Sequence, residues 1–258
     1  MPMSLSENAL SSPTLFVGAH PDDETLGMAV AIAHEVRAGQ NVHVAWLTAG
    51  TSSAVRDVLN GLEPSDYWGT VRHDPATEGY QPLDIGAFGR ARLNEAGNAV
   101  RQLATGYAGS LTIHDGLGLI DGQVTVADAQ RLIIALCRRV AGQGPVRMRT
   151  HTWQPELDEH PDHLAAGAAV RSLQAADPAT FGDVRYYVLP DRWTDAERSP
   201  VDPRWESPAD SGVTARVINA CRAYNAWSPA QGTFAIGYHS VPEFFDQLVG
   251  QPRSLYHT

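Results

Sequence analysis

The chain has 258 residues, 43% of them hydrophobic, and a formal net charge of −10. This length suits one α/β domain with a well-buried core, and no apolar run of about 18 residues is present to span a membrane. A protein with this negative charge repels the phosphate backbones of nucleic acids, so we do not expect nucleic acid as a partner. The sequence contains no lysine, which excludes Schiff-base, Ser–Lys and P-loop lysine chemistry.

The chain begins with a polar stretch. Residues 1–13 lack both a basic start and an apolar run, so we expect a short disordered lead rather than a signal peptide, and a cytoplasmic protein. Residues 14–258 are then expected to form a single domain. Cys137 and Cys221 are too few for a disulfide scaffold and lack metal-binding spacing, so both are expected to be buried free thiols.

The first three predicted elements form a βαβ unit. Residues 14–19 are a short apolar run that predicts a buried strand. Residues 24–38 carry apolar side chains at helical spacing and end before Gly39, and residues 42–48 predict a second strand. A unit of this size indicates a parallel sheet.

The alternation continues along the chain. Strands are expected at residues 110–114, 146–150 and 184–189, and helices at residues 90–104, 125–140, 161–175, 215–227 and 242–248. The predicted fold is therefore a single α/β domain with a mostly parallel, open, Rossmann-like sheet flanked by helices. Two long irregular stretches, residues 51–89 and 190–212, are expected to rim a pocket at the carboxyl ends of the strands.

The first chemical motif follows the first strand, where residues 19–24 are Ala-His-Pro-Asp-Asp-Glu. Ligand sites form at such strand ends, and histidine and carboxylate side chains suit Zn²⁺. Of the adjacent Asp22 and Asp23, one can bind a metal while the other reaches a water molecule on it. The alternative is a simple helix cap with His20 exposed. A dinucleotide site is disfavoured, because the G-x-G-x-x-G fingerprint is absent.

The second motif follows another predicted strand, where residues 158–163 are Asp-Glu-His-Pro-Asp-His. Proline favours the first helical position, which puts His160 at the cap and His163 in the first turn of one helix face. Asp162 is placed to support a neighbouring imidazole through a hydrogen bond. A capped helix with exposed histidines is the alternative. Two such clusters at strand-to-helix junctions favour a shared metal site.

Together the two motifs resemble the hallmarks of the LmbE-like or PIG-L family of zinc-dependent N-acetylglucosaminyl deacetylases. Weaker similarities are Leu-Thr-Ala-Gly at residues 47–50, Arg92 with Glu95, and His-Asp-Gly at residues 114–116. The resemblance covers roughly residues 14–175 and implies the deacetylase fold of that family. It also implies a substrate, an N-acetylated amino sugar in a glycoside or glycoconjugate, including those of natural-product biosynthesis.

The resemblance also implies residue roles. His20, Asp23 and His163 would bind Zn²⁺, Asp22 would be the general base, and His160 would polarise the carbonyl or donate a proton. The residues implied near the sugar are Arg92 and Asp115. Two histidines and one carboxylate also match Fe²⁺ sites, so iron is an alternative metal. An amidase of a small thiol conjugate and a non-catalytic sugar-binding protein are the alternative functions.

The carboxyl-terminal third matches no motif. The tyrosine that some relatives carry before the second motif is absent, since residues 156–159 are Glu-Leu-Asp-Glu. His239 either enters the pocket from this end or lies on the surface. The loop aromatics either hold a bulky aglycone or pack onto the core; they are Trp68, Tyr80, Trp193 and Trp205.

Overall fold

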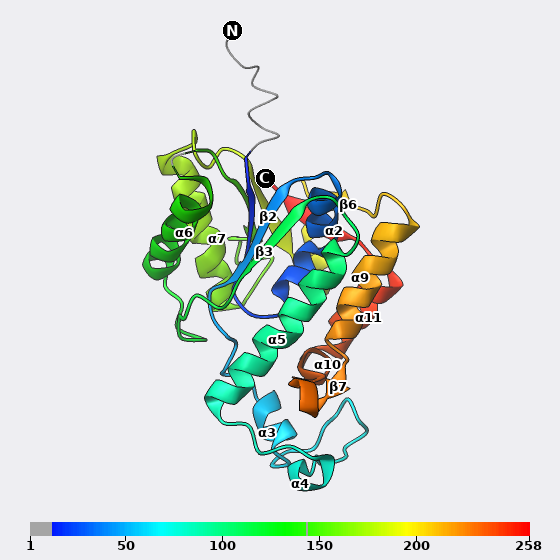
Figure 1. Cartoon of the computed structure of the whole chain (residues 1–258). Coiled ribbons are helices and arrows are strands. Elements are labelled where there is room, and N and C mark those ends of the chain that lie inside the picture. The colour runs from blue at the N-terminus through cyan, green and yellow to red at the C-terminus, as the bar shows by residue number, and fades with distance from the viewer. Residues whose placement is uncertain (1–11, 143) are drawn as a thin grey trace.

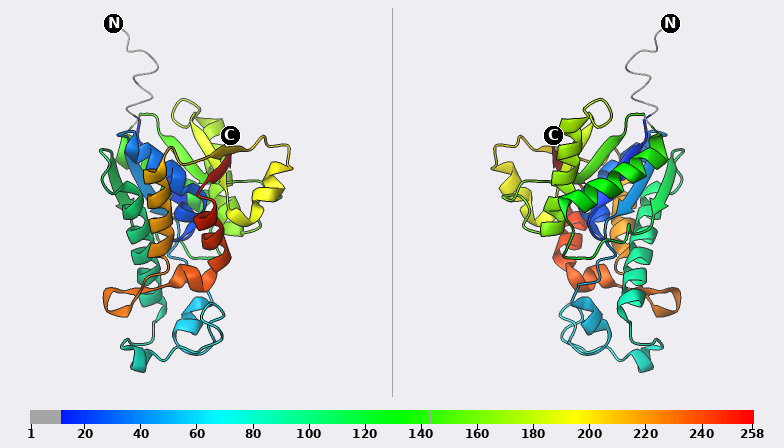
Figure 2. Two further views of the ribbon diagram at one scale, coloured as in Figure 1. Left: turned by 90° about the vertical axis from the view of Figure 1, so that its right-hand side faces the viewer. Right: turned by 90° about the vertical axis from the view of Figure 1, so that its left-hand side faces the viewer.

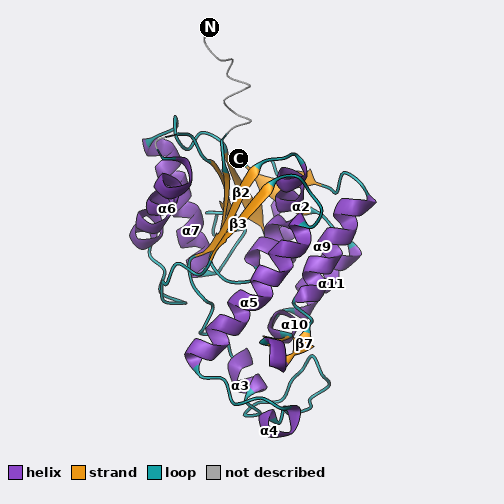
Figure 3. Ribbon diagram, viewed as in Figure 1, coloured by secondary structure: helices purple, strands orange, loops and turns teal. Residues whose placement is uncertain are grey.

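The computed structural model describes residues 12–142 and 144–258. All but two residues of the expected disordered lead therefore lie outside the described part. The described residues form a seven-stranded sheet through the centre of the molecule (Figure 3). In sheet order its strands are β3 (Ser110–His114), β2 (Asn41–Trp46), β1 (Thr14–Gly18), β4 (Arg147–His151), β5 (Val184–Val188), β9 (Ser254–His257) and β6 (Arg204–Glu206).

Helices cover both faces of this sheet (Figure 1). One face carries α6 (Val126–Ala141) and α7 (Pro161–Ala176), and the other carries α2 (Asp23–Arg37), α5 (Ile85–Ala104) and α9 (Ser211–Ala223), with α11 (Pro242–Gly250) against α9 and α2. Each face has its own apolar cluster. The central strands are therefore buried on both sides, which is why their sequences are nearly continuous apolar runs.

The predicted mostly parallel α/β sheet is confirmed. Strands β3, β2, β1, β4 and β5 pair in parallel with their neighbours, and β9 pairs antiparallel with both β5 and β6. Strands β9 and β6 were not predicted. Both are short edge elements, and no local pattern distinguishes them from loops.

Helix boundaries differ from the prediction where an aspartate caps the helix. Asp84 accepts a hydrogen bond from the Ala87 amide at 2.6 Å, so α5 begins five residues before the expected start at residue 90. Asp210 accepts from the Val213 amide at 3.0 Å, so α9 begins at Ser211 instead of residue 215. Side-chain acceptors at the cap satisfy amides that lack intrahelical partners.

Short elements divide the two long irregular stretches. The first holds α3 (Val55–Leu59) and α4 (Pro75–Glu78), which extend below the sheet (Figure 2). The second holds a 3-10 turn at Pro190–Arg192, α8 (Trp193–Glu197) and β6. Farther along, β7 (Trp227–Ser228), a 3-10 turn at Pro229–Gln231, β8 (Thr233–Phe234) and α10 (Ile236–Ser240) lead into α11.

Two expectations from composition can be compared with this fold. Cys137 and Cys221 are buried free thiols, as expected. None of the helices in the described ranges has the length and apolar character that crossing a membrane would require.

Candidate metal centre

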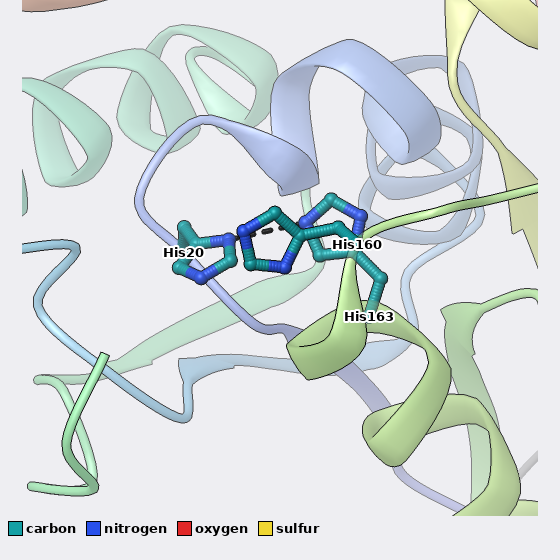
Figure 4. Close-up of side chains that lie close together, drawn as sticks. All are labelled: His20, His160 and His163. Atoms are coloured by element: carbon teal, nitrogen blue, oxygen red, sulfur yellow. Dashed lines mark hydrogen bonds between the residues drawn. The ribbon is translucent and has the colours of Figure 1, made fainter. Parts of the chain in front are cut away.

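The two His-Pro-Asp motifs meet at the carboxyl ends of neighbouring parallel strands. The first follows β1, and the second leads into α7 after β4, the strand that pairs with β1. Figure 4 shows the imidazoles of His20, His160 and His163 gathered in one place although they lie about half the chain apart. The expected convergence of the two segments is therefore present.

Two imidazole nitrogens and the two oxygens of one carboxylate lie close together in this cluster. The His20 Nδ1 atom lies 3.1 Å from His163 Nε2, His163 Nε2 lies 3.4 Å from Asp23 Oδ1, and Asp23 Oδ2 lies 3.7 Å from His20 Nδ1. Ligands at roughly 2.0–2.1 Å from a tetrahedral zinc ion stand about 3.3 Å apart. The residues present therefore fit a zinc ion in both chemistry and spacing.

The Asp23 carboxylate is held in one orientation. Its Oδ2 atom accepts a hydrogen bond from the His20 amide at 2.6 Å and lies 2.9 Å from His151 Nε2. The His151 ring also stacks on His163, with centroids 4.0 Å apart. Oδ1 is left free to face His163. His151 was not predicted as a site residue, although its position directly after the predicted strand of residues 146–150 is a usable signal.

Carboxylates also contact the far nitrogens of His20 and His163. Asp158 Oδ2 lies 2.9 Å from His163 Nδ1, and His20 Nε2 lies 3.2 Å from Asp162 Oδ2 and 3.1 Å from Asp121 Oδ1. Burial opposes ionisation of these carboxyls, but their hydrogen bonds, with His20 or His163 and with backbone amides, outweigh it and lower their pKa values. Ionised partners fix ring orientation and make the metal-facing nitrogen more basic.

Asp22 lies beside this centre in a strained conformation. Its φ of 138° is in a region that residues other than glycine rarely occupy, a form of strain common at functional sites. Arg92 donates to Asp22 Oδ2 at 2.8 Å, and both side chains are nearly buried. Burial raises the pKa of Asp22 to about 6, although the Arg92 charge opposes this rise.

The two residues that the resemblance places near the sugar occupy different environments. Arg92 lines the cavity and also donates to the carbonyls of Gly50 and Pro21, at 2.7 and 2.9 Å. A Cβ atom at Gly50 would lie 2.1 Å from this guanidinium, which explains the glycine of the Leu-Thr-Ala-Gly segment.

Asp115 differs from Arg92, since its side chain is exposed and is not among the described residues lining the cavity, whereas Asp121 lines it. The reason is that the chain after β3 continues past Asp115 before it turns back to the site. The role of Asp115 near the sugar therefore stays a prediction.

His160 caps helix α7 with its own ring. The His160 Nδ1 atom accepts a hydrogen bond from the Asp162 amide at 3.2 Å, which leaves the ring proton on Nε2. Burial, and then the neighbouring His163 and His20, lower the pKa of His160. A neutral imidazole with a proton to donate therefore borders the cavity.

The carboxyl-terminal third supports the first motif from behind. The fully buried Glu24 accepts hydrogen bonds from the Tyr224 hydroxyl at 2.8 Å, the Trp46 indole at 2.8 Å and the Asp22 amide at 3.2 Å. Burial raises the pKa of Glu24 to about 7. Glu95 likewise accepts from the amides of Phe234 and Ile236, which ties the segment before α10 to α5.

His239 does not line the cavity, and it is only half-buried. Its Nδ1 atom lies 2.8 Å from the Ser65 hydroxyl, and its ring packs against Trp68 and Trp227, outside the cavity lining. For the loop aromatics the structure favours the packing alternative, since Tyr80 and Trp193 are buried in the core. Trp68, Tyr80, Trp193 and Trp205 contact other aromatic rings, and none is among the described residues lining the cavity.

The cavity over the centre has a volume of about 570 Å³, within the usual range for small-molecule sites. Both long irregular stretches reach it, through Ser52 and Ser53 from the first and Asp191 and Arg192 from the second. Both stretches were expected to rim the pocket, and each contributes two residues to its lining.

Comparison with known proteins adds three similarities. A deacetylase of Mycobacterium avium (strain 104), described as acting on 1D-myo-inositol 2-acetamido-2-deoxy-alpha-D-glucopyranoside, is 37% identical over 75 residues, which are 28% of this chain and 25% of that protein. The A40926 pseudoaglycone deacetylase Dbv21 superimposes with a TM-score of 0.60 at 17% identity, covering 96% of both chains. GalB, the 4-carboxy-2-hydroxymuconate hydratase of Pseudomonas putida KT2440, superimposes with a TM-score of 0.58 at 15% identity, covering 92% of this chain and 84% of the other.

These similarities differ in what they establish. The structural matches show the fold alone, and a hydratase among them shows that this fold does not determine the reaction. The curated relative is matched over only about a quarter of its length. The model of the PIG-L family, described as GlcNAc-PI de-N-acetylase, matches residues 15–174 and includes both His-Pro-Asp motifs. This chain therefore belongs to the PIG-L family.

Proposed function

We propose that this chain is a metal-dependent hydrolase that removes an N-acetyl group from an amino sugar. The observation that carries the proposal is the convergence of His20, Asp23 and His163 at 3.1–3.7 Å, with Asp22 and His160 lining the same cavity. A sugar-binding protein would not need a base and a proton donor beside the ligands. Membership of the PIG-L family and the similarity to an inositol-linked acetamido-sugar deacetylase support the same reaction.

The proposed cation is Zn²⁺, held by His20, Asp23 and His163, with Fe²⁺ as the alternative. When bound, such an ion supplies Lewis-acid chemistry, since it polarises a carbonyl group and makes a water molecule more acidic. Three protein ligands leave coordination positions open for water and substrate.

Asp22 and His160 divide the proton transfers. Arg92 occupies Asp22 Oδ2, so we assign Oδ1 the role of taking the proton from the attacking water. A pKa of about 6 leaves Asp22 mostly ionised near neutral pH while raising its affinity for a proton, which suits a general base. We assign His160 Nε2–H the role of donating a hydrogen bond to the acetamide oxygen as negative charge develops there. Asp22, once protonated, returns its proton to the departing amine.

Metal analysis and a substrate panel test this function. The protein is stripped with a chelator, reloaded with Zn²⁺ or Fe²⁺, and assayed for acetate release from methyl N-acetylglucosaminide and from an N-acetylglucosaminyl inositol. We expect hydrolysis that disappears on stripping and returns with metal. Release of a carboxylate from a small thiol conjugate alone would favour the amidase alternative. Binding of sugars without any hydrolysis would overturn the proposed reaction.

A further inference from the structure

The cavity over the candidate metal centre has two unlike walls. Ser52, Ser53 and Asp121 form a polar wall on the side of β2 and β3. Four apolar residues from other segments also line the cavity, and together we call them the apolar wall: Leu26, Leu189, Val241 and Phe244. Hydroxyl and carboxylate groups suit the hydroxyls of a sugar, but they do not explain the second wall.

Three separate elements build the apolar wall. Leu26 lies on α2 one turn after Asp22, Leu189 directly follows β5, and Phe244 lies in the first turn of α11. Phe244 is half-buried, whereas its neighbour Phe245 is fully buried in the core. The helix therefore buries the Phe245 ring in the core, whereas Phe244 packs partly against that core and also lines the cavity. An apolar wall beside polar catalytic groups is typical of a site that receives an apolar part of its ligand.

The charge of the cavity limits what that ligand can carry. Six carboxylates line it against two arginines, so it stays net negative even with a divalent cation bound. Both arginines are already paired: Arg92 donates to Asp22 at 2.8 Å, and Arg192 lies 2.8 Å from Glu159 and 3.3 Å from Asp191. Among the described lining residues, neither arginine is therefore free to bind a phosphate group. The net negative charge of the cavity also repels a phosphate.

We propose that the substrate is an N-acylated amino sugar that carries an apolar substituent free of phosphate, and that Phe244 determines the preference for it. This inference rests on the proposed deacetylase function and adds the substrate class. The apolar substituent is either the aglycone or an acyl chain longer than acetyl, since both present the same chemistry to this wall.

Binding to a catalytically impaired protein tests the inference without relying on turnover. The zinc-loaded Asp22→Asn variant is titrated calorimetrically with methyl N-acetylglucosaminide, octyl N-acetylglucosaminide below its micelle concentration, methyl N-octanoylglucosaminide and N-acetylglucosamine 1-phosphate. We expect one octyl compound to bind at least about tenfold more tightly than the methyl acetamide, since each buried methylene adds affinity. Tighter binding of the octyl glycoside would indicate an aglycone site, and tighter binding of the N-octanoyl compound would indicate a site for the acyl chain. The phosphate should bind most weakly.

Variants at position 244 identify the residue responsible. In the same background, Phe244→Ala should reduce the octyl advantage to about threefold or less, and Phe244→Leu should retain part of it. Asp246→Asn is the matched control, because Asp246 is exposed on the same helix and outside the cavity lining. Thermal unfolding checks that each variant is folded.

Equal affinity for the methyl and both octyl compounds, an octyl advantage that survives Phe244→Ala, or tighter binding of the phosphate would each overturn the inference. The parent enzyme separates this failure from that of the proposed function. Hydrolysis of the methyl glycoside without an octyl advantage refutes only the apolar site. A Phe244-dependent octyl advantage without hydrolysis of any acetamido sugar refutes only the deacetylase reaction.

Discussion

The family-matched segment, residues 15–174, and the carboxyl-terminal segment that follows it contribute to the site in different ways. The first supplies the atoms proposed for the chemistry: two histidines and an aspartate at ligand spacing, with Asp22 and His160 beside them. The second supplies none of these groups. It contributes the hydroxyl of Tyr224 to Glu24, two amides to Glu95, and the Phe244 side of the cavity.

This difference shows that the groups proposed for the chemistry come from short segments of the sequence, whereas the residues proposed for substrate selectivity come from segments far apart in the chain. The chemical groups occupy two short motifs, because a strand end followed by a helix start presents several side chains at once. The apolar wall needs elements that are distant in sequence. A hydratase shares this fold, so the fold by itself does not determine the reaction.

The largest expected effect is at Asp22. Asp22→Asn should lower kcat about 10²–10⁴-fold while zinc stays bound, because the amide removes the base but not the ligands. Steady-state kinetics together with metal analysis check this. Parent-like turnover would show that the first motif does not hold the base.

A smaller effect is expected at Asp158, which touches His163 but not the cation. Asp158→Asn should weaken zinc affinity about 10–100-fold, since the histidine loses its orienting carboxylate. Competition with a chelator measures it, with His163→Ala as the variant that loses the metal site. The matched control is Asp115→Asn, which is exposed and should keep parental affinity. Equal losses in the two asparagine variants would deny the specific role of Asp158.

Tyr224→Phe tests whether the carboxyl-terminal segment only supports the site. Loss of the hydrogen bond to buried Glu24 should cost about 1–2 kcal/mol of unfolding free energy, measured in urea. Turnover should fall less than about tenfold, because Glu24 still holds the Asp22 amide. A fall in kcat as large as that of Asp22→Asn would place this segment in the chemistry and break the comparison.

The smallest effect concerns acid stability. Burial lowers the pKa of His257 to about 4, and its Nε2 atom lies 2.8 Å from the Thr152 hydroxyl. As pH falls, His257 is therefore protonated in the unfolded chain before it is protonated in the folded chain. The free energy of unfolding that this histidine contributes is retained above about pH 6.5 and is lost as pH falls toward 4. His257→Gln should reduce this acid-side loss by about 1–2 kcal/mol. Unfolding at pH 4.5 and 7.5 measures it, and identical losses in parent and variant would contradict this assignment.

Much of the fold and the centre could be predicted because the signals are local. Apolar runs bounded by turn residues located β1 to β5, and alternation with helices implied their parallel order. Both His-Pro-Asp motifs could then be placed at carboxyl ends of that sheet. Asp121 and His151 were missed, because what makes them part of the site is contact across the sheet with His20 and Asp23.

By itself the sequence determined the parallel α/β sheet, the meeting of two motifs at its edge and the chemistry that their side chains permit, because strand and helix periodicities are readable over a few residues. Only the tertiary structure decided that β9 inserts between β5 and β6, that Asp121 rather than Asp115 reaches the cavity, and that Phe244 instead of the loop aromatics lines it. These outcomes depend on packing between segments far apart in the chain, and no local pattern records which distant surfaces will bury one another.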